Sequence, residues 1–123
     1  MGLAALRRGI ILAPVPSMIT ENDIQYRCNK SKATAFIGDE AMVKKFRAVR
    51  FWCPSVKTVM QVGGLVPEDT VDYYKAMENI PPSDQLESLH LPWDHPAIIY
   101  FTSGTSGLAK MVIHKKVSYP LGK

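Results

Sequence analysis

The chain has 123 residues, of which 46% are hydrophobic and 21% are charged, and its formal net charge is +4. This composition is that of a folded globular domain and excludes a disordered or fibrous chain. No segment reaches the roughly 18 consecutive apolar residues of a membrane-spanning helix, so we expect no membrane span.

Four apolar runs in chain order predict strands, at residues 10–14, 33–37, 57–62 and 97–102. They are rich in Ile, Val and Phe and show little alternation, as strands buried on both faces do. In the first run, Pro14 and Pro16 leave too few apolar residues for the hydrophobic region of a signal peptide. We therefore interpret residues 8–15 as the entry into a buried strand.

Helices are predicted between these strands, at residues 20–29, 39–51 and 70–79. The first has Thr20 as N-cap and Asp23 in the position of a capping box, with Ile19 and Ile24 spaced as a hydrophobic staple. The segment 80–96 contains four prolines and predicts a loop. Strands alternating with helices predict an α/β fold, with a mostly parallel sheet and flanking helices.

Two cysteines and a basic cluster each allow more than one interpretation. Cys28 and Cys53 match no metal or redox spacing, so we expect two reduced, buried thiols. The basic cluster alternates with apolar residues at helical spacing, which favours a solvated helix face over a nucleic-acid-binding surface. The cluster consists of Lys44, Lys45, Arg47 and Arg50.

The segment "TSGTSGLAK", residues 102–110, follows the last predicted strand, where ligands of α/β sheets bind. Gly104 and Gly107 can adopt positive φ and turn backbone N–H groups into a concave anion-binding nest. Four hydroxyls and the ammonium of Lys110 add donors for phosphate oxygens. The spacing is neither G-x-x-x-x-G-K-[ST] nor G-x-G-x-x-G. The residues alone leave two alternatives, a phosphate cradle and a flexible turn.

The stretch "YFTSGTSGLAK" resembles the signature loop of the adenylate-forming superfamily, which includes acyl-CoA synthetases, luciferases and adenylation domains of peptide synthetases. Three further segments are similar to the medium-chain acyl-CoA synthetase branch. They are residues 6–40, the lead-in "DHPAIIYF" and the later "SYPLG". Ala109 stands where the family usually has proline, which loosens the loop without removing a donor.

The resemblance implies an incomplete piece of the N-terminal domain of an adenylate-forming enzyme, covering residues 1–123 and lacking the C-terminal lid. The implied reaction is an ATP-dependent carboxylate–CoA ligation of a medium-chain or aromatic acid through an acyl adenylate. It implies ATP, Mg²⁺ held by downstream ligands, and coenzyme A. The loop residues that would hold the ATP phosphates are Thr102, Ser103, Gly104, Thr105, Ser106, Gly107 and Lys110.

His114 falls where the family often has a histidine and is a candidate on the substrate side, although an interior strand histidine is an equal alternative. His90, Asp94 and His95 suggest a metal only weakly, so we predict no metal site. The implied downstream motifs do not occur in these residues, and we expect a chain that is inactive alone and whose partners include missing segments of the same enzyme. Two alternatives are an inactive remnant that binds nucleotide weakly or packs against a partner, and a small basic nucleic-acid-binding module. We expect no nucleic-acid partner and an intracellular location, cytoplasmic or mitochondrial.

Overall fold

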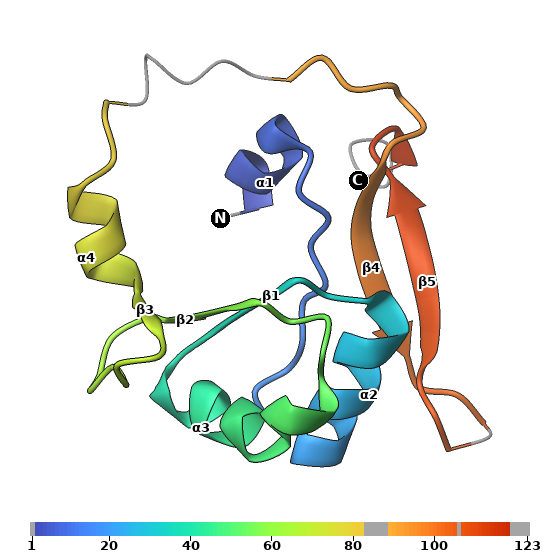
Figure 1. Ribbon diagram of the computed structural model, residues 1–123. Helices are drawn as coiled ribbons and strands as arrows, with labels where there is room; N and C mark the ends of the chain where they lie inside the picture. The colour runs from blue at the N-terminus through green and yellow to red at the C-terminus, as the bar shows by residue number, and fades with distance from the viewer. Residues whose placement is uncertain (1, 83–88, 106, 119–123) are drawn as a thin grey trace. The chain divides into compact units, whose positions relative to one another are not determined.

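The computed structural model describes residues 2–82, 89–105 and 107–118. The chain divides into two compact units, one of residues 16–82 and one of residues 1–15 with 83–123 (Figure 1). Each unit is a separate assembly of helices and strands. The α/β class predicted from the sequence is confirmed.

Unit 16–82 contains a three-stranded parallel sheet in the order β1-β2-β3. Its elements in chain order are α2 (Glu21–Ser31), β1 (Ala35–Gly38), α3 (Glu40–Val49), the 3-10 helix η1 (Arg50–Trp52), β2 (Thr58–Gln61), β3 (Val71–Asp72) and α4 (Tyr73–Glu78). The predicted strands at 33–37 and 57–62 and the predicted helices at 20–29 and 39–51 correspond to β1, β2, α2 and α3 with η1. Strand β3 was not predicted.

The predicted helix at 70–79 begins three residues later than expected. Val71 and Asp72 pair with β2 as a parallel strand before the helix starts. The Asp72 carboxylate then accepts hydrogen bonds from the backbone N–H groups of Tyr74 and Lys75, at 3.0 and 3.3 Å. Asp72 is therefore both the end of a strand and the N-cap of α4.

Side-chain caps set where α2 and α3 begin. The Thr20 hydroxyl accepts from the Asp23 N–H at 3.2 Å, and the Asp23 carboxylate accepts from the Thr20 N–H at 3.4 Å. These two bonds form the predicted capping box, and Ile19 and Ile24 of the staple are both buried. Asp39 caps α3 by accepting from the Met42 N–H at 2.8 Å.

The core of this unit lies between the sheet and α3, and α2 packs against α3 in turn. Phe36 of β1 stacks on Phe46 of α3 with ring centroids 4.5 Å apart. Val59 of β2 points to the same side as Phe36, because the two residues are paired in the sheet. All three side chains are buried.

The opposite face of the sheet carries an apolar row of one residue from each strand. Ile37 pairs with Met60, and Met60 pairs with Val71. Ile37 is 43% exposed and Val71 is 40% exposed. Parallel sheets are normally covered on both faces, so this row is an apolar surface that the described residues leave partly open to solvent.

The basic cluster of α3 and η1 is partly solvent-exposed, as the sequence predicted, but most of its side chains also make contacts within the unit. Lys45 donates to the carbonyl of Ile19 at 2.9 Å. Arg47 and Arg50 both pair with Asp69, Arg50 at 2.7 Å. The hydrogen bond from Arg47 is the main reason why the pKa of the Asp69 carboxyl lies below its usual value, and the charge of Arg50 lowers it further.

The second unit contains α1 (Gly2–Arg8) and an antiparallel hairpin of β4 (Pro96–Thr102) and β5 (Lys110–Lys115). The hairpin confirms the predicted strand at 97–102 and adds β5 after the loop. Helix α1 was not predicted. In the segment predicted as loop, 80–96, the described residues 80–82 and 89–95 contain no helix or strand, and Pro96 already belongs to β4.

The predicted strand at 10–14 is wrong, because this segment makes only one parallel bridge, between Leu12 and Ile98. Leu12 donates to the Ala97 carbonyl at 3.0 Å and accepts from the Ile99 N–H at 2.7 Å. Continuing the ladder would require an N–H at residue 14, and Pro14 has none. On the other side, Ile10 donates instead to the Ala5 carbonyl at 2.9 Å. The bridge therefore cannot grow into a strand in either direction.

Candidate functional site

The candidate phosphate loop forms the turn of the β4–β5 hairpin (Figure 1). Thr102 ends β4 and Lys110 begins β5, and these two residues form the last pair of the ladder. Directly paired residues point to the same side of a sheet. The hydroxyl of Thr102 and the ammonium-bearing chain of Lys110 therefore flank the loop on one face. The loop therefore follows the predicted strand at 97–102, as the sequence indicated.

The loop presents its polar groups to solvent. Thr102, Ser103, Thr105 and Lys110 are exposed. Ser106 lies outside the described residues. The described part of the loop thus offers three hydroxyls and one cation on the surface, which is the donor set expected for a phosphate.

The two glycines of the loop are required for different reasons. Gly107 has φ +89°, and nothing lies within 4 Å of the position that a Cβ would take. Gly104 does not have positive φ, which corrects the expectation that both glycines adopt it. A Cβ on Gly104 would lie 2.6 Å from the Leu108 carbonyl oxygen, so the absence of a side chain lets the loop fold back on itself.

His114 lies on the same face of the hairpin as Lys110 but farther along the strand. Successive residues of a strand point to opposite faces, so Lys110, Val112 and His114 lie on the same face. Four residues of strand separate Lys110 from His114 by about 13 Å. The His114 ring instead meets the Tyr100 ring edge-on, with centroids 5.4 Å apart. The structure therefore does not bring His114 to the loop donors, and Tyr100 is a neighbour that the sequence analysis missed.

The other histidines considered from the sequence do not form a cluster of metal ligands. The His95 Nε2 atom lies 3.2 Å from the Gly9 carbonyl oxygen, a contact that ties the segment before β4 to the end of α1. Among the described residues, no group of three or more His, Cys, Asp or Glu side chains is arranged to hold a metal ion.

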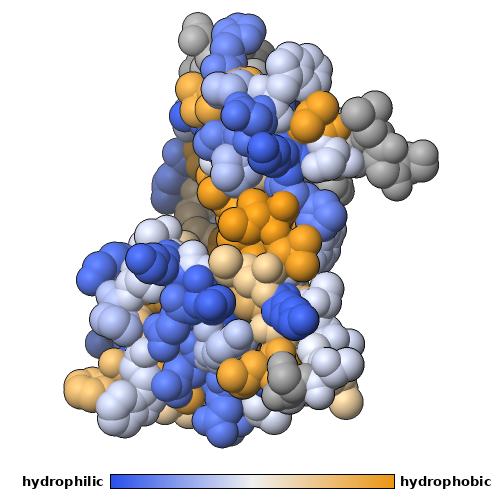
Figure 2. All heavy atoms as spheres, turned by 90° about the vertical axis from the view of Figure 1, so that its right-hand side faces the viewer, coloured by the Kyte–Doolittle hydropathy of each residue, from blue (hydrophilic) through white to orange (hydrophobic). Residues whose placement is uncertain are grey.

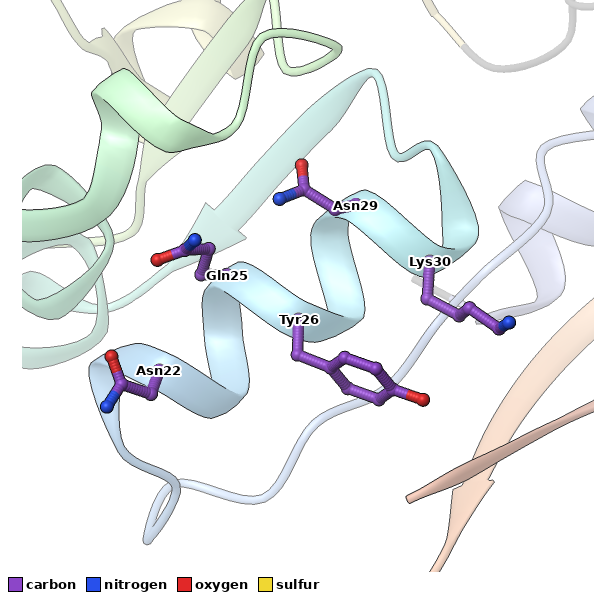
Figure 3. Close-up of a pocket in the computed structure, with 5 residues that line it drawn as sticks. All are labelled: Asn22, Gln25, Tyr26, Asn29 and Lys30. Atoms are coloured by element: carbon purple, nitrogen blue, oxygen red, sulfur yellow. The ribbon is translucent and has the colours of Figure 1, made fainter. Parts of the chain in front are cut away.

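A separate hollow, which the sequence analysis did not identify, lies along α2 in the other unit (Figure 3). The hollow is open to solvent. The spacing of polar residues along α2 is the feature of the sequence from which it could have been predicted. The Asn29 amide is already engaged, donating to the Trp52 carbonyl at 2.9 Å. The lining residues are Asn22, Gln25, Tyr26, Asn29 and Lys30.

A family model described as AMP-binding enzyme matches residues 1–119. The chain belongs to the AMP-binding enzyme family. This match confirms the family resemblance that the sequence indicated.

Curated relatives point to one branch of the AMP-binding family. The human mitochondrial acyl-coenzyme A synthetase ACSM5 is 30% identical over 122 residues, which cover 99% of this chain and 21% of the relative. The human mitochondrial ACSM1 is 30% identical over 115 residues, covering 93% of this chain and 19% of the relative. The chain thus spans about a fifth of the length of the curated relatives that it matches.

Solved structures of adenylate-forming enzymes share the fold. The anthranilate CoA ligase AuaEII, solved with anthranoyl-AMP, has a TM-score of 0.85 at 18% identity, covering 92% of this chain and 21% of that protein. The red-emitting luciferase of Phrixothrix hirtus has a TM-score of 0.79 at 21% identity, covering 94% and 23%. Among the residues that the structure describes, no helix has the length and hydropathy needed to cross a bilayer.

Proposed function

We propose that the chain is part of an ATP-dependent carboxylate–CoA ligase and that its loop at residues 102–110 holds the β- and γ-phosphates of ATP. The observation that carries the proposal is the pairing of Thr102 with Lys110 at the base of an exposed, hydroxyl-rich turn. Membership of the AMP-binding family and similarity to acyl-CoA synthetases support it.

The loop contributes positioning and charge neutralisation. A carboxylate oxygen of the acid attacks the α-phosphorus of ATP and pyrophosphate leaves; the coenzyme A thiolate then attacks the acyl carbonyl and AMP leaves. Lys110 would neutralise charge on the departing pyrophosphate, and the hydroxyls of Thr102, Ser103 and Thr105 would orient its oxygens. The close packing of Gly104 against Leu108 would keep the backbone donors of the turn in place.

Magnesium would have to be held by residues outside the hairpin. Residues 96–115 include no Asp or Glu, and oxygen ligands of this kind are what Mg²⁺ prefers. The second candidate function is a chain that binds nucleotide through the loop without catalysing acyl transfer. In either case we propose residues 1–123 as part of the AMP-binding domain.

The proposals for the substrate and the compartment rest on the similarity to relatives. The ACSM relatives are acyl-CoA synthetases named as mitochondrial, and the structural neighbour AuaEII is an anthranilate CoA ligase. From AuaEII we propose an aromatic carboxylic acid as substrate, and from the sequence resemblance to the medium-chain branch a medium-chain acid as the alternative. Coenzyme A is the proposed acceptor, and the proposed location is intracellular, cytoplasmic or mitochondrial. The remaining parts of the same enzyme are the proposed partners, in preference to nucleic acid.

The test is nucleotide binding to the 123-residue chain, measured by calorimetry with Mg-ATP. Replacing Lys110 by Ala removes a charge-assisted contact and should weaken binding by about tenfold, allowing for the exposure of this lysine. Lys115→Ala is the matched control, because it removes the same charge from the same strand and lies on the other face. It should change affinity by less than about twofold.

Equal affinity of the parent and Lys110→Ala would show that the loop is only a turn. Pyrophosphate release is followed in parallel with octanoate and with benzoate as acids. Pyrophosphate release by the chain would support the ligase over the nucleotide-binding candidate. Binding to duplex DNA that declines steeply with salt, without nucleotide binding, would support the nucleic-acid alternative.

A further inference from the structure

The two cysteines, distant in the sequence, occupy neighbouring buried positions in unit 16–82. Cys28 lies on the buried side of α2, one turn after Ile24. Cys53 follows η1, and its N–H donates to the Arg50 carbonyl at 3.0 Å. Their side chains are 6% and 1% exposed. The predicted burial of both thiols is confirmed, whereas nothing in their spacing indicated that they meet.

The two thiols are hydrogen-bonded to one another. The adjacent residues are also joined, because the Asn29 side-chain amide donates to the Trp52 carbonyl at 2.9 Å. The Val56 N–H donates to the Cys53 carbonyl at 3.2 Å and fixes the chain on the other side of Cys53. The Asn29–Trp52 contact therefore holds the C-terminal half of α2 against η1, directly beside both cysteines, and the Val56 bond fixes the turn that carries Cys53.

We propose that Cys28 and Cys53 are a disulfide-forming pair, whose oxidation joins α2 covalently to the segment after η1. With oxidised glutathione as the oxidant, one protein thiolate attacks a glutathione sulfur and a glutathione thiolate leaves. The second cysteine then attacks the protein sulfur of this mixed disulfide, and the second glutathione leaves as thiolate. Both electrons and both protons of the two thiols end on two molecules of reduced glutathione.

Burial controls the rate of this reaction rather than its direction. Burial, with the neighbouring Cys53 as a smaller cause, raises the pKa of the Cys28 thiol to about 12, and burial also raises the pKa of Cys53. The reactive thiolate is therefore scarce in the folded chain at neutral pH, and the oxidant must reach the pair through local opening. We expect slow oxidation in native buffer and faster oxidation in mild denaturant.

The disulfide should stabilise the unit because the native contact already brings the sulfur atoms together. Closing the loop from residue 28 to residue 53 restricts the unfolded chain, which raises the thermal midpoint by roughly 5–15 °C. If the two sulfur atoms could bond only by distorting the fold, the disulfide would lower the thermal midpoint, because it would strain the folded state.

The experiment incubates the 123-residue chain in glutathione buffers of increasing oxidised fraction, at about pH 8 where an ordinary thiol begins to ionise. Free thiols are counted by alkylation after quenching and denaturation, and peptide mapping locates the bond. We expect loss of both thiols together, a Cys28–Cys53 peptide in a chain that runs as a monomer in non-reducing denaturing electrophoresis, and the raised thermal midpoint. Cys28→Ala and Cys53→Ala are the matched controls, and glutathione buffers should not raise their midpoints.

Glutathione mixed disulfides or intermolecular dimers as the main products would overturn the proposal, as would an intramolecular bond that lowers the midpoint. The thiol count and the peptide map of the parent chain decide the outcome even where a cysteine variant fails to fold.

Discussion

At the scale of single residues, the loop shows that identical residue types can be required by different physical causes. Gly107 is needed for its left-handed backbone, whereas Gly104 is needed for the space that a side chain would occupy against the Leu108 carbonyl. A strained backbone costs of order 1–2 kcal/mol, while a methyl group 2.6 Å from a carbonyl oxygen forces the backbone to move. The two positions should therefore respond differently to the same substitution.

We predict that Gly104→Ala impairs Mg-ATP binding far more than Gly107→Ala does. The first substitution displaces the segment at Leu108 that leads into Lys110, whereas the second strains an exposed turn with free space around it. Calorimetric titration of both variants measures the difference, and thermal unfolding serves as the control for folding. A larger loss of affinity for Gly107→Ala than for Gly104→Ala would contradict the role assigned to Gly104.

At the scale of elements, short-range hydrogen bonds decide where helices begin and where strands stop. The Thr20–Asp23 capping box starts α2 where the sequence predicted, because both partners lie within one turn. The bridge at Leu12 stops for an equally local reason, the missing N–H of Pro14.

Thr20→Ala should lower the free energy of unfolding by about 1 kcal/mol, because it leaves the Asp23 N–H without its cap. Thr20→Ser keeps the hydroxyl and is expected to retain most of the stability. Urea unfolding followed by circular dichroism measures both. If the Ser variant loses as much stability as the Ala variant, the methyl group rather than the cap is responsible.

At the scale of the whole molecule, the uncovered sheet face is the main structural liability. Ile37, Met60 and Val71 form one row across three parallel strands, with the two outer residues open to solvent. Other apolar side chains are exposed too, and Figure 2 shows hydrophobic residues at the surface among polar ones. A contiguous apolar row on a sheet is a stronger cause of association than single exposed residues.

We predict that the isolated chain self-associates and that Ile37→Lys reduces the association by placing a charge in the row. Leu65→Lys is the control, since Leu65 is 87% exposed in the chain that leads from β2 to β3 and lies outside the row. Sedimentation velocity over a range of concentrations measures both variants against the parent. A parent chain that stays monomeric and melts above ~65 °C would rule out this reading of the sheet face.

The sequence by itself determined the features that depend on residues close to one another along the chain. The capping residues of α2, the apolar runs of β1, β2 and β4, and the turn chemistry of residues 102–110 are all visible in short segments. These signals sufficed for the α/β class and for the family resemblance, which the match over residues 1–119 confirmed. They did not suffice for α1, which lacks a cap signal, or for β3, a two-residue strand that is defined only by its partner β2.

Only the tertiary structure decided which distant residues meet. The thiol pair of Cys28 and Cys53 and the ring contact of Tyr100 with His114 depend on packing and on strand register. The order β1-β2-β3 likewise places Ile37, Met60 and Val71 in one row, although each lies in a separate strand. Hydrogen-bonded caps act over three or four residues and can be read from the chain, whereas packing contacts join any residues that the fold brings together and cannot.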